Sequence, residues 1–219
     1  MDELTPFDRR AGDYDRWFDE NPAVYQAELR AVRRFIPETG SGVEIGAGTG
    51  RFAIPLGIAA AVEPSGPMAR IAKDKNLPVC RALGERLPFH DDQFDFALLA
   101  TVVCFVADPA LLFREAGRVI KPGGRVIVAF IDRETEIGRL YESRKDANGF
   151  YRGARFYSAR EIEALLLGAG FGSLKFCQTI IGLPDKSGTP PGEDKALRLL
   201  DGSGEGGFAV ACAVTSTSP

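Results

Sequence analysis

Short apolar runs alternate with amphipathic segments through the first 131 residues of the chain. The runs, at about 42–46, 58–62, 78–82, 94–100 and 125–131, contain few polar side chains. Near-continuous apolar runs of this length are typical of strands buried on both faces of a parallel sheet. Apolar residues recur at helical spacing between the runs. We therefore predict a doubly wound α/β fold with helices on both faces of the sheet.

Residues that commonly start or stop helices bound the predicted helices. A polar capping side chain precedes each of four of them, and proline follows it in two cases. These capping residues are Asn21, Ser65, Asp108 and Ser158, the last paired with Glu161 in a capping box. A short helix is also expected at about 50–57, and the Lys-Pro-Gly-Gly segment 121–124 ends the helix that starts after Asp108.

Two segments flank or interrupt the alternation of strands and helices. Residues 1–37 form an expected helical arm with embedded aromatic side chains, and residues 132–156 form a polar, highly charged helical insertion. Strands at 173–181 and 207–215 complete an expected seven-stranded, mostly parallel sheet with one antiparallel strand near the C-terminus. The connection 182–206 is rich in Pro, Gly and charge and is predicted to be a surface loop, with a short helix at 195–200 as an option.

Composition limits the function classes. The 219 residues are 45% hydrophobic and 26% charged, and the net charge is -3. This balance argues against a basic nucleic-acid surface, so no nucleic-acid partner is expected. No apolar run reaches the length of about 18 residues that crosses a bilayer, so no membrane partner is expected. The acidic N-terminus is unlike a signal peptide, and a cytoplasmic location is the expectation.

The cysteines and the single histidine favour no metal site. Cys80, Cys104, Cys177 and Cys212 are far apart in sequence, and His90 cannot supply a cluster. We expect buried, reduced thiols and no metal. The alternative, thiols that bind a soft metalloid, requires several of them to converge in space.

An alternating glycine turn follows the first predicted strand. Gly46, Gly48 and Gly50 lie between that strand and a predicted helix, and glycine lets the backbone approach a ligand closely. Glu63 ends the second predicted strand, at the edge where doubly wound folds bind ligands. A carboxylate there can accept hydrogen bonds from both hydroxyls of a ribose; the alternative is an ordinary solvated acid. A pyridine-nucleotide dehydrogenase is disfavoured, because its fingerprint spaces the third glycine differently and expects an acid about 20 residues later.

The sequence resembles the class I S-adenosylmethionine-dependent methyltransferases, especially their small-molecule group. The resemblance covers about 40–180 and depends on the order of several loose motifs. They are Glu44-Ile45-Gly46-Ala47-Gly48-Thr49-Gly50 and the segments 62–65, 84–89, 94–97, 115–124 and 156–158. It implies a single Rossmann-like domain over 1–219 and S-adenosylmethionine as cofactor, with S-adenosylhomocysteine as product.

The resemblance also implies a role for several residues. Gly46, Ala47 and Gly48 would face the methionine and ribose portion of the cofactor, with Glu44 near its amino group. Glu63 and Pro64 would lie at the ribose, and Thr101 beside the donor methyl. The family usually has an acid for the adenine amine where this chain has Leu83. Adenine recognition is left to the backbone of Leu83 and Gly84, to Glu85, or to packing alone.

Acceptor-binding residues are expected in the arm and the insertion, which this fold places over the carboxyl ends of the strands. Tyr14 and Trp17 could close over the sulfonium or the acceptor, or could simply pack the arm onto the domain. Asp132, Tyr151, Arg152 and Arg155 are candidates from the insertion, with ordinary surface charge as the alternative. No catalytic base is identified.

Two functions are therefore carried forward. The first is methyl transfer by direct displacement to a small-molecule acceptor, with attack by O, N, S or C left open. The second is an S-adenosylmethionine-binding protein without transfer activity, a sensor or partner subunit. A monomer or homodimer is expected in either case.

Overall fold

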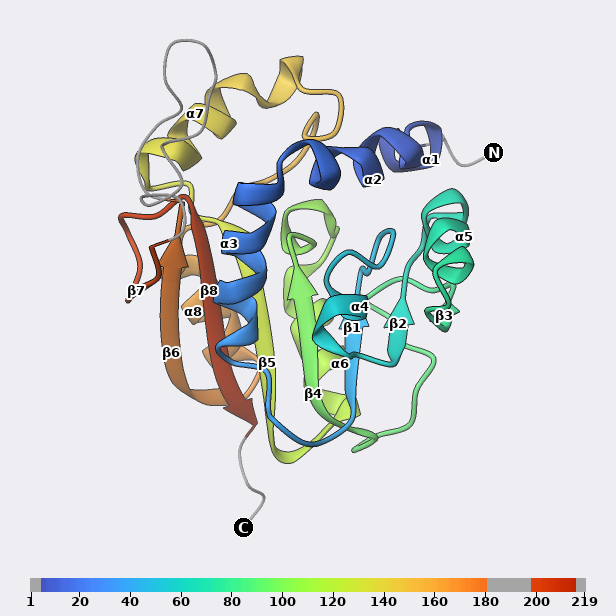
Figure 1. Ribbon diagram of the computed structural model, residues 1–219. Coiled ribbons are helices and arrows are strands. Elements are labelled where there is room, and N and C mark those ends of the chain that lie inside the picture. Colours follow the sequence, from blue (N-terminus) through green and yellow to red (C-terminus); the bar gives the residue numbers. More distant parts are fainter. Residues whose placement is uncertain (1–4, 181–197, 216–219) are drawn as a thin grey trace.

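One sheet runs through the molecule, which we describe from a computed structural model for residues 5–180 and 198–215 (Figure 1). Within these residues the sheet has eight strands in the order β3-β2-β1-β4-β5-β8-β6-β7. The strands are β1 (Gly42–Ile45), β2 (Ala60–Val62), β3 (Val79–Cys80), β4 (Phe94–Ala100), β5 (Ile120–Ile131), β6 (Phe171–Thr179), β7 (Leu200–Asp201) and β8 (Phe208–Thr215).

The pairing of the strands confirms the predicted doubly wound, mostly parallel sheet. β1 to β5 pair in parallel, whereas β8 runs antiparallel to both β5 and β6. The expected strand count was one too low, because the two-residue β7 pairs antiparallel with β6 at Cys177 and Gln178. So short a strand leaves no apolar run to detect. Leu200, an option for helix, is strand instead, and the 182–197 part of the predicted loop lies outside the described residues.

Helices cover both faces of the sheet, as predicted. One apolar cluster packs α3 (Pro22–Arg33), α4 (Ala53–Leu56) and α5 (Gly66–Asp74) onto one face. A second cluster packs α6 (Pro109–Val119) and α8 (Ala159–Gly168) onto the other. No helix among the described residues is long and apolar enough to cross a membrane.

Three of the four predicted capping side chains accept the expected backbone hydrogen bond. Ser65, Asp108 and Ser158 cap α5, α6 and α8, and Ser158 forms the predicted capping box with Glu161. The prediction for Asn21 was wrong: its side chain donates to the Trp17 carbonyl and so closes the helix before it. The expected helix at 50–57 is also shorter, covering only α4.

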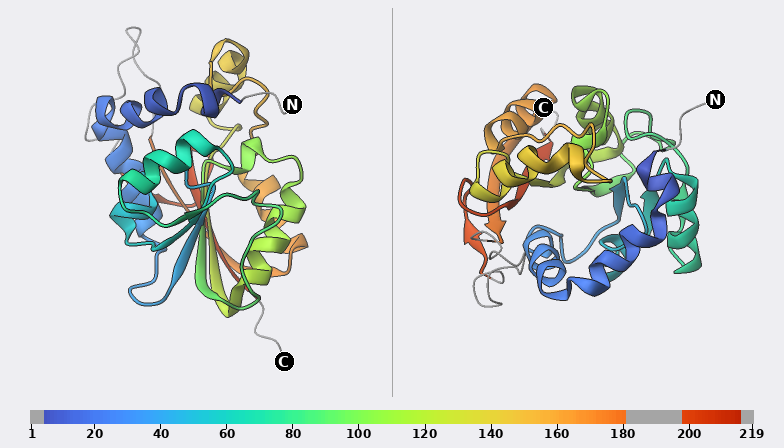
Figure 2. Two further views of the ribbon diagram at one scale, coloured as in Figure 1. Left: turned by 90° about the vertical axis from the view of Figure 1, so that its right-hand side faces the viewer. Right: turned by 90° about the horizontal axis from the view of Figure 1, so that it is seen from above.

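The arm and the insertion lie over the carboxyl ends of the parallel strands (Figure 2). The arm contains α1 (Pro6–Arg9), α2 (Ala11–Glu20) and α3, and the first two contact α5. The insertion contains α7 (Glu136–Arg144) and the short 3-10 helix η2 (Lys145–Ala147). Seen from above, α1 and α2 lie on one side of the strand ends and α7 on the other.

Candidate active site

The glycine turn joins β1 to α4 in a conformation that needs glycine. The N–H groups of Gly46 and Ala47 both donate to the Val62 carbonyl, at 2.8 and 3.0 Å, which anchors the turn on β2. Gly46 has a φ of +75°, and a Cβ there would lie 2.0 Å from a Val102 methyl carbon. Gly48 has a φ of +55°, and a Cβ there would point at the Tyr14 ring. A larger residue at either position would strain the backbone or crowd its neighbours.

Glu63 lies at the carboxyl end of β2 and braces this turn. One carboxylate oxygen accepts the Gly48 N–H and the other accepts the Ser65 N–H, each at 2.8 Å. Burial raises the pKa of Glu63 above its usual value, and the two backbone hydrogen bonds oppose that shift. A carboxylate oxygen can accept more than one hydrogen bond, so both oxygens keep capacity for a ligand. Pro64, beside it, is exposed.

Glu44 is a deeply buried acid at this edge of the sheet, with only 1% of its surface exposed. The Ala53 N–H donates to its carboxylate. Its Oε2 atom has no hydrogen-bond partner among the described residues. Burial, together with the nearby charge of Glu63, raises the pKa of Glu44 well above its usual value. An unsatisfied buried carboxyl oxygen calls for a partner that the described residues do not supply.

The 83–85 turn packs against the end of β1, since a Cβ on Gly84 would lie 3.0 Å from an Ile45 methyl carbon. Leu83 is 60% exposed, so its side chain is free to cover a ligand. Gly84 packs tightly, since a Cβ there would lie 2.5 Å from a Leu112 methyl carbon. Glu85 accepts the Ala107 N–H at 3.1 Å, which ties the turn to the segment after the 3-10 helix η1 (Val103–Phe105). Its carboxylate therefore already has a structural partner.

Thr101 follows β4 with a φ of +55°. This conformation is rare for a β-branched residue and is found where the surrounding structure holds it. The Thr101 N–H donates to the Ala129 carbonyl on β5 at 2.8 Å. Its side chain also lies within hydrogen-bonding reach of the Tyr14 hydroxyl. Thr101 thus links the end of β4 to the arm.

A small apolar cavity opens beside Thr101. Its volume is about 10 Å³, which is room for roughly one water molecule. Residues from the ends of β4 and β5 and from the insertion line it: Thr101, Val103, Cys104, Phe130, Ile131, Tyr151, Phe156 and Tyr157. This cavity adjoins the place where the sequence predicted the donor methyl group.

Of the two aromatic candidates in the arm, only Tyr14 reaches the site. Its ring makes edge contacts with Phe7 and Phe18, with centroids 5.9 and 5.2 Å apart. It also contacts Phe150 of the insertion at 6.0 Å. Trp17 is 37% exposed and contacts Phe18 from outside this group. Its contact with Phe18 fits the alternative expectation, that Trp17 packs the arm onto the domain, better than closure over the sulfonium or the acceptor.

Of the candidates in the insertion, Tyr151 is the one whose side chain lines the cavity. It stacks on Phe105 at 5.9 Å and lines the cavity. Asp132 is buried, but its carboxylate accepts the Glu134 N–H at 3.1 Å and so stabilises a turn. Arg155 is 69% exposed and lies 3.8 Å from Glu161 at the start of α8. Arg152 is exposed as well, and its Nε donates to the Asp146 carbonyl.

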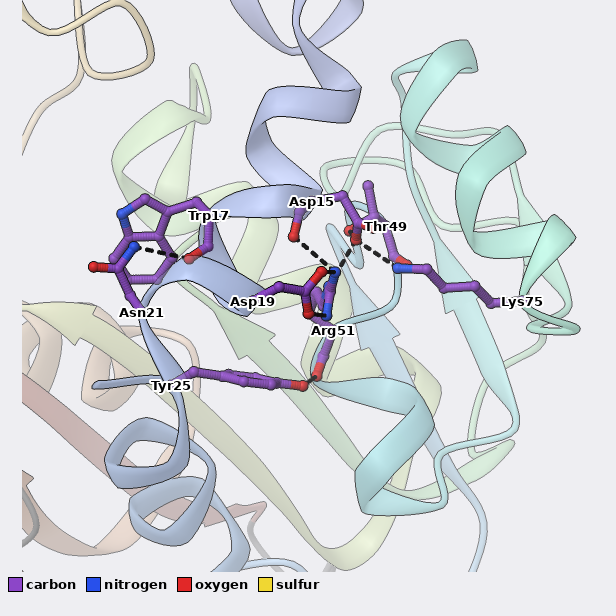
Figure 3. A network of polar contacts seen from close by, with 8 residues as sticks. All are labelled: Asp15, Trp17, Asp19, Asn21, Tyr25, Thr49, Arg51 and Lys75. Atoms are coloured by element: carbon purple, nitrogen blue, oxygen red, sulfur yellow. Dashed lines mark hydrogen bonds and ion pairs between the residues drawn. The ribbon is translucent and has the colours of Figure 1, made fainter. Parts of the chain in front are cut away.

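A polar network ties the arm to the glycine turn (Figure 3). One carboxylate oxygen of Asp15, on α2, accepts hydrogen bonds from Thr49, Arg51 and Lys75 at 2.6, 2.7 and 2.5 Å. Arg51 also bonds both carboxylate oxygens of Asp19. Burial alone would raise the pKa of Asp15, but these donors lower it to about 2. Asp15 is therefore ionised at neutral pH and holds α2 over the turn.

Sequence reasoning missed Glu28 and the network around Asp15. Glu28 lies on the inward face of α3, between the apolar positions Tyr25 and Val32. An acid inside an apolar helical stripe is visible in sequence and could have been noted. The partners of Asp15 lie 34 to 60 residues away, and no local pattern could have revealed them.

The cysteines and His90 form no metal site. Cys80 is exposed, contrary to the expectation of buried thiols, Cys104 is half-buried, and Cys177 and Cys212 are buried. His90 is exposed. In the described part of the chain, no group of three or more His, Cys, Asp or Glu side chains is arranged to hold a metal ion.

The fold and site together define a class of protein. A doubly wound sheet whose first strand ends in a glycine turn, with an acid ending the next strand, binds nucleotide-like ligands at that edge. A methyltransferase domain family matches residues 43–128.

Solved and sequenced relatives extend this match over nearly the whole chain. A Thermotoga maritima crystal structure of a SAM-dependent methyltransferase, described as a possible histamine N-methyltransferase, is 43% identical, with a TM-score of 0.88. The match covers 96% of this chain and 99% of that one. An uncharacterized protein of Methanocaldococcus jannaschii is 44% identical over 94% of this chain and 97% of its own length. An uncharacterized Mycobacterium tuberculosis protein is 39% identical over 74% of this chain, which spans 59% of that relative.

The chain belongs to the S-adenosylmethionine-dependent methyltransferases, and S-adenosylmethionine is its cofactor. The family resemblance predicted from the ordered motifs is thereby confirmed.

Proposed function

We propose that this methyltransferase acts on a small-molecule acceptor, which binds between the glycine turn, the arm and the insertion. The observation that carries the proposal is the enclosure of Thr101. The arm reaches it through Tyr14, and the insertion reaches it through Tyr151. A macromolecular acceptor would have to displace one of these covers, whereas a small molecule needs only a transient opening.

The residues at the glycine turn fit S-adenosylmethionine. The unsatisfied Oε2 atom of Glu44 would pair with the cofactor's ammonium group, which supplies the missing donor. Glu63 would accept the ribose hydroxyls on the oxygens that already brace Gly48 and Ser65. Gly46, Ala47 and Gly48 would let the backbone come close to the cofactor. Leu83 and the backbone of Gly84 would cover the adenine, while Glu85 holds the turn in place.

When bound, S-adenosylmethionine supplies a methyl group that is already activated for displacement. What the chain must contribute is orientation of the acceptor, which is worth about 7 to 11 kcal/mol in well-aligned reactions. Tyr14 and Thr101 lie where they could position the acceptor against the donor. The apolar lining around Tyr151 and Phe156 would exclude water from that contact.

Cofactor binding tests the first half of the proposal. We expect Glu63→Ala to weaken S-adenosylmethionine binding by about 10- to 100-fold, because hydrogen bonds to a charged group contribute about 1.5 to 3 kcal/mol. Isothermal titration calorimetry measures this. Glu163→Ala, at an exposed position on α8, is the matched control and should bind like the unmodified chain. Binding that is indifferent to Glu63 would contradict the assignment.

Turnover tests the second half. Formation of S-adenosylhomocysteine is measured with histamine, suggested by the description of the Thermotoga maritima relative, and with catechol and a simple aromatic thiol. We expect at least one small acceptor to support turnover. Tight cofactor binding without turnover on any of them would contradict the proposal and favour a binding protein without transfer activity.

A further inference from the structure

Arg81 directly follows β3 and reaches across the edge of the sheet where the nucleoside end of the cofactor would bind. Its Nη2 atom donates to the Pro64 carbonyl at 3.1 Å, and Pro64 directly follows Glu63. In the chain Arg81 stands two residues before Leu83. The arginine therefore connects the segment at the expected ribose to the turn at the expected adenine.

One face of the Arg81 guanidinium packs on the start of α5. A Cβ built on Gly66 would lie 3.4, 3.4 and 3.7 Å from the central carbon and the two terminal nitrogens of this group. Three nearly equal distances place that point above the guanidinium plane and not at its edge. Arg81 is an exposed residue, and no carboxylate of the described residues forms an ion pair with it. The opposite face of the guanidinium is thus suited to cover a flat ligand group.

The acids around this segment already have backbone partners. Leu83 replaces the acid that would receive the adenine amine, and its side chain offers no hydrogen bond. The Glu85 carboxylate accepts the Ala107 N–H at 3.1 Å. Asp8 of α1 acts on Arg81 at longer range, and its Oδ2 atom accepts the N–H and the hydroxyl of Thr5 at 2.9 and 2.7 Å. The guanidinium of Arg81 is therefore the better placed group to recognise the base.

We propose that Arg81 binds the adenine of S-adenosylmethionine by stacking its guanidinium on the base, and that this contact replaces recognition of the 6-amino group by an acid. The guanidinium is planar and delocalised, and such planes stack on nucleobases and aromatic rings. A contact with the face of the base needs no hydrogen-bonding group at the purine 6 position. The inference concerns the cofactor, so it does not depend on which acceptor is methylated.

Variants of Arg81 test the stacking contact through binding of S-adenosylhomocysteine, measured by isothermal titration calorimetry. We expect Arg81→Ala to weaken binding by about 3- to 10-fold, the usual size of a cation–π contact at a partly exposed site. Arg81→Lys keeps the charge and a donor for Pro64 but lacks the plane, so it should show the same loss. Arg70→Ala, at an exposed position on α5, is the matched control and should bind like the unmodified chain. Full affinity in Arg81→Ala or in Arg81→Lys would overturn the inference.

A base analogue tests the indifference to the amine. The probe is the S-adenosylhomocysteine analogue whose base is unsubstituted purine, which lacks only the 6-amino group. We expect the unmodified chain to bind the two ligands within about threefold of each other, and Arg81→Ala to weaken both equally. Loss of a hydrogen bond to a carboxylate would instead cost about 10- to 100-fold. A preference above tenfold for S-adenosylhomocysteine would overturn the inference, and its disappearance in Asp8→Asn would identify Asp8 as the group that binds the amine.

Amide hydrogen exchange separates direct contact with the base from an indirect, structural role. An indirect role would act through the Pro64 carbonyl and the neighbouring Glu63, whose carboxylate binds the N–H groups of Gly48 and Ser65. Release of that carboxylate would speed the exchange of both amides in the cofactor-free protein. We expect their exchange rates in Arg81→Ala to match those of the unmodified chain. Faster exchange of both amides would overturn the direct role of Arg81.

The outcomes distinguish failure of this inference from failure of the proposed function. If Arg81→Ala binds S-adenosylhomocysteine like the unmodified chain while Glu63→Ala weakens cofactor binding, the role of Arg81 is overturned and the proposed cofactor site stands. Turnover on the acceptor panel is unaffected by that result. Absence of S-adenosylhomocysteine binding to the unmodified chain overturns this inference together with the proposed cofactor site.

Discussion

Three buried or half-buried glutamates dominate the chemistry at the scale of single residues. Glu44 lies in β1 and Glu63 directly follows the adjacent parallel strand β2, whereas Glu28 lies on α3 of the arm. Burial raises the pKa of all three. A carboxylate in a low-dielectric interior is unfavourable without a cation, so a cationic ligand beside such a group lowers its pKa. Binding of a cation should therefore release protons from the protein.

Glu44→Gln tests this at the glycine turn. The amide can still accept the Ala53 N–H but cannot pair with the cofactor's ammonium group. We expect S-adenosylmethionine affinity to fall by about tenfold or more, which corresponds to about 1.4 kcal/mol. Calorimetry in buffers of different ionisation enthalpy measures the protons released on binding, and that number should fall in the variant. If the variant released as many protons as the unmodified chain, the raised pKa of Glu44 would have no part in cofactor binding.

At the scale of elements, the arm is held by polar contacts as much as by packing. Phe18 of α2 is buried against Tyr25 and Phe52, while Asp15 gathers Thr49, Arg51 and Lys75 around one oxygen. Because Thr49 and Arg51 belong to the glycine turn itself, the position of α2 and the shape of the turn are coupled. Access to the cofactor site should depend on this network.

Asp15→Asn should loosen the arm. The neutral amide keeps the shape of the side chain but loses the charge-assisted bonds to Arg51 and Lys75. We expect the free energy of unfolding to fall by about 2 kcal/mol, measured by urea denaturation, and amide hydrogen exchange in α2 to accelerate. Asp13→Asn is the matched control. Its exposed ion pairs with Arg10 and Arg16 should contribute less than about 0.5 kcal/mol. Equal effects of the two variants would argue against a special role for Asp15.

At the scale of the whole molecule, the parallel strands direct their carboxyl ends to one edge, and the arm and insertion cover that edge (Figure 1). The two faces of the sheet hold the two apolar clusters. Folding thus concentrates the unfavourable buried acids at the covered edge, while the rest of the sheet stabilises the chain. The free energy of unfolding should therefore change with pH as these acids titrate.

Glu28 should make the protein less stable as pH rises. Its pKa moves from an ordinary value of 4.5 to about 8 on folding, so the folded state holds a proton that the unfolded state releases in this range. The free energy of unfolding therefore falls between about pH 4.5 and pH 8. Glu28→Gln should match the unmodified chain near pH 4.5 and melt at a higher temperature at pH 8.5. Glu20→Gln is the control, and a difference in melting temperature that does not vary with pH would contradict the prediction.

Local patterns were enough for the parts of the site that are continuous in sequence. The glycine turn, Glu44 and Glu63 follow strands that their apolar runs predict, and parallel strands bring such ends together without further information. The capping residues Ser65, Asp108 and Ser158 were predictable for the same reason, because a cap acts within one turn of helix. The prediction for Asn21 was wrong because an Asn side chain can also hydrogen-bond to the end of the preceding helix.

The sequence by itself therefore determined the fold class, the cofactor edge and the methyltransferase family. Only the tertiary structure decided which arm and insertion residues meet. Tyr14 and Tyr151 lie beside Thr101, whereas Trp17 contacts Phe18, Asp132 accepts a backbone N–H and Arg155 lies near Glu161. Such contacts depend on how helices pack across the sheet edge, and no local periodicity or spacing encodes that geometry.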